Sequence, residues 1–542
     1  MMAKREIQIA SAIERALTEL GISPPEGGVK VERPARLEHG DYATSVALEL
    51  SKPLGKNPRS FAQEIIETRA ISEIPHLKGI ELAGPGFINF RLMDSHLHES
   101  LLELLHQGEA DFAKSDLGHG EKIQLEFVSA NPTGPLHVGN AWWASYGDAI
   151  KRVLERSGFD VKTEYYVNDT GGQIRTLGES LLARRSNQAP PEDGYQGEYV
   201  VELAKRYQGP DDVSEAGKFA VKENLAAIKA SLLNLNINFD EWFSQASIEE
   251  SGAVDETIGI LASMGATYEK DGALWLEATR FGDNRDRVLR KSDGYFTYLA
   301  GDIAYHRNKF LVRGFDRVID IFGADHHGQV ASLKAAMSAL GIDPNRLEIL
   351  IGQMVSLVEG DRKVKFSKRA GNIVSMEWLV SELGPAVTRL LSLSSSLDRA
   401  AVIDIEEAKS TSMDNPAYYI QYAHARISSI FRVAESRGVL AQELAEVSLD
   451  LLKTPRELEL IRTLISLPDV VGDAAISRAP QRVVAWLKSL ASAFHGFYHD
   501  CPILAEGIEE ELLQARLQLA KATQIGLRVA LFLVGIEAPE QM

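Results

Sequence analysis

The stretch that decides the fold reads IQLEFVSANPTGPLHVGN, at residues 123–140. Residues 123–128 are mostly apolar, as in a buried strand, and a loop with two prolines and a glycine follows. Helical spacing of apolar residues begins at residue 137 and continues to about 157, where Gly158 ends it. A strand, a short loop and a helix in this order predict the first unit of a parallel α/β sheet.

The same alternation continues downstream. Residues 161–167, 317–322 and 347–358 carry strand patterns, and residues 329–340 carry helical spacing. Alternating strands and helices with short turns predict a Rossmann-type, doubly wound parallel sheet, and we expect this catalytic domain to cover residues 116–398. The segment from about 170 to 295 is helical and charged, and we interpret it as an insertion.

The flanking parts differ from this pattern. Residues 1–115 predict a small α+β domain, with helices at 7–20 and 41–50, the latter ending near Lys52–Pro53, and a strand at 87–92. Residues 399–542 lose nearly all strand signals. Helical spacing at 418–435, 456–467, 481–499 and 509–533 predicts an all-α helical bundle there.

Composition limits the class of protein. The chain has 542 residues, 45% of them hydrophobic, and is too long for one core. The sequence contains no apolar run of about 18 residues, so no membrane span is predicted. The N-terminus lacks the apolar core of a secretion signal. The single cysteine, Cys501, excludes an internal disulfide and a cysteine-rich zinc site, so we expect a cytoplasmic location.

The net charge of −18 argues against a nucleic-acid partner, and residues 401–542 are themselves acidic. Binding depends on local patches and not on the total charge of the surface. Any contact with RNA must therefore rely on local basic groups and on shape.

The first constellation with chemical meaning is the turn Pro132–Asn140. A helix N-terminus offers free N–H groups and partial positive charge to a phosphate. His137 can donate to a phosphoryl oxygen, Gly139 leaves room for a ring or ribose, and Asn140 adds polar contacts. The alternative is an ordinary capped helix with an incidental histidine.

The second constellation is Lys365–Phe366–Ser367–Lys368–Arg369–Ala370–Gly371–Asn372, after a predicted strand. Three cations and a serine on such a loop can neutralise charge that develops on a polyphosphate. The alternative is a solvated basic loop. Both constellations lie at predicted strand ends, in the order expected of two halves of one nucleotide site.

Together the two motifs resemble the His-x-Gly-His/Asn and Lys-x-Ser-Lys signatures of class I aminoacyl-tRNA synthetases. The residues at 126–140, 165–173, 298–305, 323–329 and 535–542 are similar to arginyl-tRNA synthetases in particular. The resemblance implies catalytic roles for His137, Asn140, Lys365 and Lys368. It implies ATP contacts from Pro132, Thr133, Gly134, Pro135, Leu136, His137, Val138, Gly139, Asn140, Gly323, Asp325, His326, Lys365, Ser367 and Lys368.

An arginine substrate agrees with the acidic residues nearby. A guanidinium is planar, permanently charged and carries five donors, so its pocket needs carboxylates and an aromatic or hydroxyl group. The resemblance assigns the guanidinium to Glu126, Tyr298 and Asp302, and the α-amino or carboxylate end to Asn131, with Ser129 and His326 also at the amino acid. Tyr298 and Asp302 stand four apart, on one helix face. Each has an alternative as an ordinary surface or core residue.

His326–His327 beside Asp325 is a pattern typical of metal sites, but no further ligands stand at usable spacing. We therefore expect no tightly held metal in the protein. ATP with Mg²⁺ is expected as a co-substrate, held chiefly by phosphates and water. The resemblance places this loop beside ATP and the amino acid.

Tyr418, Tyr422 and Arg426 lie on a helix where aromatic and basic residues alternate. Aromatic rings can stack on splayed bases and arginine can hold phosphate, so these residues are candidates for tRNA contact. The alternative is that the tyrosines pack in the core of the bundle. The resemblance assigns residues 399–542 to the anticodon and residues 1–115 to the tRNA elbow.

The predicted function is ATP-dependent formation of arginyl-adenylate and transfer of arginine to tRNA(Arg). The resemblance also implies that tRNA binds before the first step, and we expect a monomer. One rival is a carboxylate-adenylating ligase or nucleotidyltransferase of the same superfamily that charges no RNA, against which the long helical tail argues. Another is a catalytically silent tRNA-binding paralogue, against which the intact His137, Lys365 and Lys368 argue.

Overall fold

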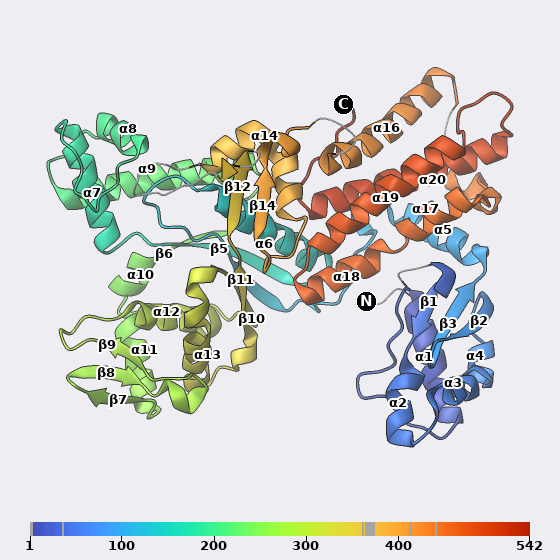
Figure 1. Ribbon diagram of the computed structural model, residues 1–542, viewed down its shortest axis with the longest axis horizontal. Coiled ribbons are helices and arrows are strands. Elements are labelled where there is room, and N and C mark those ends of the chain that lie inside the picture. Colours follow the sequence, from blue (N-terminus) through green and yellow to red (C-terminus); the bar gives the residue numbers. More distant parts are fainter. Residues whose placement is uncertain (1–3, 35–36, 360–361, 364–373, 411–414, 440–441) are drawn as a thin grey trace.

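The computed structural model describes residues 4–34, 37–359, 362–363, 374–410, 415–439 and 442–542. The molecule is elongated, with the central sheet between a helical bundle (red) and the helices of residues 172–234 (green) (Figure 1). The N-terminal part (blue) lies beside the bundle. Among the described helices, none combines the length and apolar character that crossing a bilayer needs.

The N-terminal part packs helices on a small antiparallel sheet of strand order β1-β3-β2. The prediction of a helix over 41–50 is wrong at its start, because Tyr42–Thr44 pairs as a strand with Phe90–Ile88. Its helical half is confirmed from Val46 onward. The elements are α1 (Lys4–Glu19), β1 (Tyr42–Thr44), α2 (Val46–Leu54), α3 (Pro58–Ile66), α4 (Arg69–Ser72), β2 (Leu77–Ala83) and β3 (Phe87–Leu92).

The central sheet has five parallel strands in the order β11-β10-β4-β5-β6. The chain runs outward from β4 to β6 and then returns to β10 and β11, so the direction of winding changes between β4 and β10. This is the predicted doubly wound sheet. Its strands are β4 (Lys122–Glu126), β5 (Asp160–Val167), β6 (Glu241–Ser244), β10 (Arg317–Gly323) and β11 (Leu347–Gly352).

The two faces of this sheet differ in polarity. On one face Ile123, Leu125 and Ile319 join the apolar core that contains α6 (Val138–Arg156). On the opposite face the carboxylates of Glu126, Glu164 and Asp320 meet side chains of α12 (Tyr298–Arg307) and the π-helical turn after it. Because side chains alternate along a strand, one strand serves both an apolar core and a polar layer.

The segment predicted as a helical insertion also contributes to the sheet. Its helices are α7 (Gly172–Arg185), α8 (Glu198–Arg206), α9 (Val213–Asn234), α10 (Gln245–Glu250) and α11 (Ala253–Ser263). The strand β6 lies within it and extends the central sheet at β5. The strands β7 (Thr267–Lys270), β8 (Ala273–Leu276) and β9 (Arg287–Arg290) form a separate antiparallel sheet. The helical interpretation of 170–295 was therefore incomplete.

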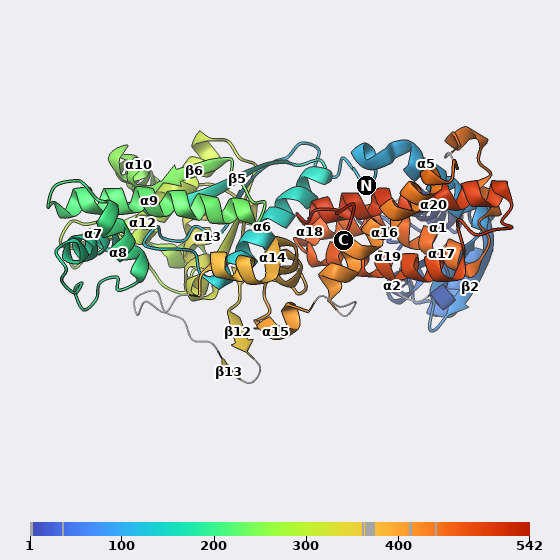
Figure 2. The same cartoon turned by 90° about the horizontal axis from the view of Figure 1, so that it is seen from above.

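The predicted strand 347–358 is two strands in different sheets. β11 ends at Gly352, and β12 (Val355–Glu359) pairs with β13 (Arg362–Lys363) and β14 (Ala401–Asp404). Seen from above, β12 and β13 project from the side of the molecule (Figure 2). The helices here are α13 (Val330–Ala339), α14 (Met376–Ser392) and α15 (Ile405–Ala408).

The C-terminal part is the predicted helical bundle. It contains α16 (Pro416–Ser436), α17 (Pro455–Leu464), α18 (Leu467–Ser477), α19 (Gln481–Asp500) and α20 (Glu510–Leu533). The predicted helix 456–467 stops at Leu464, and a new helix starts at Leu467. The helix α5 (Asp94–Asp111), which follows the N-terminal strands, packs against α17 and α20 of the bundle.

A buried arginine joins the bundle to the catalytic part. The Arg389 guanidinium, on α14, donates to the carbonyls of Val534 and Leu235, each at 2.8 Å, and pairs with the Asp148 carboxylate of α6. Burial lowers the Arg389 pKa, and the charge of Asp148 opposes this shift. One side chain therefore connects the end of α20, the end of α9 and the middle of α6.

Candidate active site

Two of the predicted site residues end neighbouring strands at the carboxyl edge of the sheet. Glu126 is the last residue of β4, and Gly323 is the last residue of β10, the neighbouring strand across the change of winding. Ligands in doubly wound sheets bind in the crevice outside the carboxyl ends of the strands at such a point. The sheet therefore brings the loop after β4 and the loop after β10 to one place.

The first motif is hydrogen-bonded to the chain that follows the second. The Val138 N–H donates to the Val374 carbonyl at 3.1 Å, and the Met376 N–H donates to the Leu136 carbonyl at 2.9 Å. His137 and Ser375 form an antiparallel bridge between these contacts. Lys365, Ser367 and Lys368 lie outside the described residues. The described chain immediately after them meets the His137 turn directly.

The turn at the start of α6 is closed by its own side chains. The Asn140 amide oxygen accepts a hydrogen bond of 2.9 Å from the His137 backbone N–H, and Asn140 is buried. A Cβ on Gly139 would lie 3.0 Å from Cε1 of His137, so the glycine leaves room for the ring. The Asn140 side chain thus stabilises the helix start, a role that the sequence interpretation did not anticipate. Its expected contact with ATP remains a prediction.

The loop before this turn is held by the insertion. The Tyr199 hydroxyl of α8 donates to the Thr133 carbonyl at 2.7 Å, and the Asn224 amide of α9 donates to the Pro132 carbonyl at 2.9 Å. A Cβ on Gly134 would lie 2.9 Å from Cζ of Tyr199. Pro132, Thr133 and Gly134 are consequently buried against these helices, together with Leu136, Val138 and Gly139, whereas Pro135 and His137 are half-buried.

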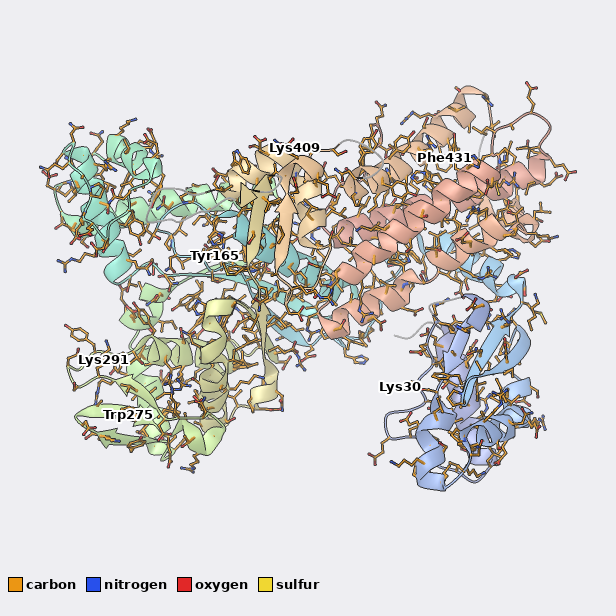
Figure 3. The ribbon with its side chains drawn as sticks, viewed as in Figure 1. Lys30, Tyr165, Trp275, Lys291, Lys409 and Phe431 are labelled. Carbon is orange, nitrogen blue, oxygen red and sulfur yellow. The ribbon has the colours of Figure 1, made fainter. Side chains whose placement is uncertain are left out.

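Asn131 belongs to a polar cluster on the same loop. Its amide donates to Gln173 Oε1 at 2.8 Å, and its carbonyl oxygen accepts a hydrogen bond of 2.6 Å from the Asn168 amide. The buried Tyr165, labelled in Figure 3, donates from its hydroxyl to the Ala130 carbonyl at 2.7 Å. These contacts fix the backbone on which Asn131 is presented.

The backbone directly after Glu126 is strained. Val128 and Ser129 have φ values of 69° and 38°, in the left-handed region that β-branched residues rarely adopt. The Ser129 hydroxyl donates to Glu126 Oε1 at 2.8 Å and accepts from the Tyr166 N–H at 3.0 Å. The strained turn thus places the Ser129 hydroxyl against Glu126, and Ser129 supports that carboxylate.

Glu126 is one of three carboxylates in a buried charge cluster. Its Oε2 accepts from Lys309 Nζ at 2.6 Å and lies 3.0 Å from the Tyr305 hydroxyl oxygen. Lys309 also donates to Asp320 Oδ1 at 2.9 Å. His306 Nε2 lies 2.8 Å from Asp320 Oδ2, and its Nδ1 lies 2.7 Å from the Asp302 carbonyl, so both ring nitrogens face acceptors.

Glu164 completes the cluster. Its carboxylate receives two hydrogen bonds from the Arg313 guanidinium, one of them at 3.0 Å, and a third from the Tyr305 hydroxyl. Lys309 and its neighbours hold the pKa of Asp320 at about 2, although burial opposes this. The positive groups here serve three carboxylates.

Asp302 differs from these acids. Its side chain is half-buried, and within the described residues no ion pair or hydrogen bond holds its carboxylate. Burial, with a further contribution from the charge of Glu126, raises its pKa to about 6, although His306, His326 and Lys309 oppose the shift. An acid with a pKa raised in this way is a candidate for a functional site.

The remaining predicted residues lie around this cluster. Tyr298 begins α12 and is 80% exposed. His326 is exposed on the 3-10 turn Ala324–Gln329 after β10, with Nδ1 3.2 Å from Gln329 Oε1. Asp325 lies on the same turn. In the described parts of the chain, no group of three or more His, Cys, Asp or Glu side chains could hold a metal ion.

Sequence reasoning missed Tyr305, Lys309, Arg313 and the acids Glu164 and Asp320. A signal for the acids was present, because each stands at an inner position of a predicted buried strand, where a lone charge needs a partner. The four positions 302, 305, 306 and 309 repeat at helical spacing and so lie on one face of α12 and its π-helical turn.

Two of the three residues predicted to contact tRNA, Tyr422 and Arg426, line a groove on the bundle. The Tyr418 and Tyr422 rings stack with centroids 5.9 Å apart, and the Arg426 guanidinium lies 4.5 Å from the Tyr422 ring centroid. Tyr422 and Arg426 line a cavity of about 770 Å³, together with Arg432, Arg437 and Tyr498. The three arginines form a local basic patch, although the chain as a whole is negatively charged.

The sheet, the signature turn at its carboxyl edge and the helical bundle define a class I aminoacyl-tRNA synthetase. Comparison with known proteins agrees. Residues 198–424 match the class I (R) catalytic domain of tRNA synthetases, residues 7–92 match the arginyl tRNA synthetase N terminal domain, and residues 420–542 match the DALR anticodon binding domain.

The chain belongs to the arginyl-tRNA synthetase family. The prediction of an arginine–tRNA ligase from the sequence is therefore confirmed. It is 43% identical over 549 residues to the arginine–tRNA ligase of Moorella thermoacetica, covering 98% of this chain and 97% of that one. It is 41% identical to the enzyme of Shouchella clausii over the full length of both. The fold matches the arginyl-tRNA synthetase structure of Thermus thermophilus with a TM-score of 0.79, at 23% identity and full coverage of both chains.

Proposed function

We propose that arginine binds with its guanidinium between Asp302 and Glu126, and that ATP binds along the His137 turn with Lys365 and Lys368 over its phosphates. The observation that carries the arginine site is the Asp302 carboxylate, which is half-buried beside a second acid and has no cationic partner among the described side chains. A permanently charged guanidinium supplies the missing charge.

The free acceptor positions support different roles for the two acids. Glu126 Oε2 accepts from Lys309 and faces the Tyr305 hydroxyl, and Oε1 has one acceptor position left after Ser129. Both oxygens of Asp302 are available. Asp302 therefore receives the guanidinium with two hydrogen bonds, and Glu126 adds a single one. Tyr298, Ser129, Asn131 and His326 complete the amino-acid site in this proposal.

The reaction has two steps. The arginine carboxylate attacks the α-phosphorus of ATP, forming arginyl-adenylate as pyrophosphate leaves. The terminal ribose hydroxyl of tRNA then attacks the acyl carbon, and AMP leaves. The chain contributes positioning and charge stabilisation through His137, Gly139 and Asn140 at the nucleotide and the two lysines at the phosphates. Mg²⁺ enters as part of the ATP substrate.

The parts of the chain on either side of the catalytic domain bind tRNA. We assign binding of the tRNA elbow to residues 1–115, catalysis to residues 116–398 and binding of the anticodon to residues 399–542. Tyr418, Tyr422 and Arg426 lie at the basic groove of this last part. The groove supports this assignment because it combines aromatic and guanidinium surfaces. The proposed enzyme acts as a cytoplasmic monomer that binds tRNA before it forms the adenylate. The buried, unpaired thiol of Cys501 agrees with a reducing compartment.

Two measurements test this function. Total tRNA is charged with each radiolabelled amino acid in turn, and only arginine is expected to be incorporated. The variant Asp302→Asn is then expected to raise the KM for arginine by about 100-fold, because it removes an ionic partner, with little change in the KM for ATP.

The control for this variant is Glu256→Gln, which removes a carboxylate on α11 that pairs with Arg307 of α12. It should leave both constants within twofold of wild type. An Asp302→Asn enzyme with unchanged arginine KM would show that the guanidinium binds elsewhere.

A further inference from the structure

Lys309 has no place in the proposed chemistry, yet it lies in the centre of the charge cluster. It is the second residue of the π-helical turn Asn308–Val312, directly after α12, and its side chain is 0% exposed. Turns of this kind are rare and occur often at functional sites. A fully buried lysine that contacts no solvent needs partners for its charge.

All three directions of the Lys309 ammonium are occupied. It donates to Glu126 Oε2 at 2.6 Å and to Asp320 Oδ1 at 2.9 Å, and it lies 4.3 Å from the centroid of the Tyr305 ring. Because its side chain is fully buried among these groups, Lys309 is positioned to act through the groups that it holds.

Among those groups, only Glu126 reaches the edge of the sheet where the amino acid is proposed to bind. Glu126 stands near the Asp302 carboxylate, and its charge contributes to the raised pKa of Asp302. The Lys309 ammonium compensates the Glu126 charge from behind. It also occupies Oε2, so that the remaining acceptor position of the carboxylate is on Oε1.

We propose that Lys309 is a positioning residue for arginine recognition, which holds the Glu126 carboxylate in place and oriented toward the guanidinium. This inference rests on the proposed arginine site. The charged and titratable groups that surround the Lys309–Glu126 pair come from every element packed on it: Glu164, Asp302, His306, Arg313, Asp320 and His326.

The test replaces Lys309 with methionine, which keeps the shape and removes the charge. Lys309→Met is expected to raise the arginine KM at least tenfold and to change the ATP KM less than twofold. Direct calorimetric titration of arginine checks the same loss without catalysis.

Two further variants test whether a change in the arginine KM is only an effect of lost stability. Lys309→Met/Asp320→Asn removes opposite charges together, so it should recover thermal stability while the arginine KM stays high. Arg516→Met removes another buried cation, which pairs with Glu457 at 2.8 Å in the bundle, and should lower stability without raising the arginine KM. An arginine KM that returns to wild type in the double variant, or that rises equally in Arg516→Met, would reduce Lys309 to a structural ion pair.

The variant Glu126→Gln distinguishes an error in the proposed arginine site from an error in the role of Lys309. If it leaves the arginine KM unchanged, the arginine site itself is wrong. If Glu126→Gln raises the arginine KM and Lys309→Met does not, the site stands and the role of Lys309 is refuted. Tighter arginine binding by Lys309→Met would also refute it, since the lysine would then be a competitor of the substrate.

Discussion

The Tyr199 hydroxyl donates a 2.7 Å hydrogen bond to the backbone carbonyl of Thr133, across 66 residues of sequence. The ring also lies under Gly134, where a Cβ would approach it to 2.9 Å. A helix of the insertion thus supports the loop that leads to the His137 turn.

Removing this hydroxyl should weaken ATP binding. Tyr199→Phe is expected to raise the ATP KM by roughly fivefold, which corresponds to about 1 kcal/mol for one hydrogen bond. Tyr207→Phe is the control, because its hydroxyl donates to the Pro210 carbonyl within the insertion, at 2.9 Å. Equal effects of the two variants on steady-state kinetics would mean that the loop does not depend on Tyr199.

Arginine binding should depend on pH through Asp302. Its pKa is raised to about 6, chiefly by burial, and the guanidinium binds the ionised form. The arginine KM should therefore be constant above about pH 7 and rise as the pH falls through 6, approaching tenfold per unit well below it. Asp302→Asn should remove this dependence. A KM for wild type that stays flat between pH 5 and 8 would contradict the assignment.

The Arg389 junction should contribute strongly to stability. Arg389→Met leaves the Asp148 carboxylate and two carbonyls without their buried donor, and we expect a loss of about 3–5 kcal/mol in the free energy of unfolding. Arg152→Met is a matched comparison. Arg152 also pairs with Asp148, at 2.7 Å, and donates to Phe532 and Asn236, but its side chain is more exposed.

Urea unfolding compares the two variants, and the loss for Arg152→Met should be clearly smaller. Equal losses would show that burial of the guanidinium does not determine its contribution.

Changes in the basic groove should weaken the binding of tRNA and leave the binding of arginine unchanged. Arg426→Ala is expected to raise the KM for tRNA by about tenfold, in line with the loss of one guanidinium contact, and to leave the arginine KM unchanged. Arg482→Ala removes an exposed charge from the same bundle outside the groove. If both variants weaken tRNA binding alike in a filter assay, the effect is one of total charge and the groove is not the site.

Much of the fold followed from local patterns. The strands β4, β5 and β10 and the helix α6 were predicted because apolar runs and glycine-containing turns mark them in the sequence itself. Tyr42–Thr44 was predicted as helix because its neighbours are good helix formers, and pairing with β3 across the chain decided otherwise. β6 was missed because its four residues carry too short a pattern, and only the exposed edge of β5 makes it a strand.

The site residues within the family signatures could be predicted from the sequence, and the buried residues that hold them in place could not. Glu126, Asp302 and His137 stand in recognisable strings. Lys309 follows a helix with few other signals, and a lysine at a helix end is usually solvated. Its burial depends on three carboxylates from separate strands, a relation that no local window of sequence contains.

The helix α6 begins at the His137 turn and carries Asp148 ten residues further on. At 1.5 Å per residue its 19 residues form a stiff rod of about 28 Å. Through Arg389 that rod is fastened to the carbonyl of Val534, at the far end of the chain. The bundle cannot change its tilt against the sheet without shifting the nucleotide turn or breaking the guanidinium contacts, so the two ends of the enzyme are mechanically coupled.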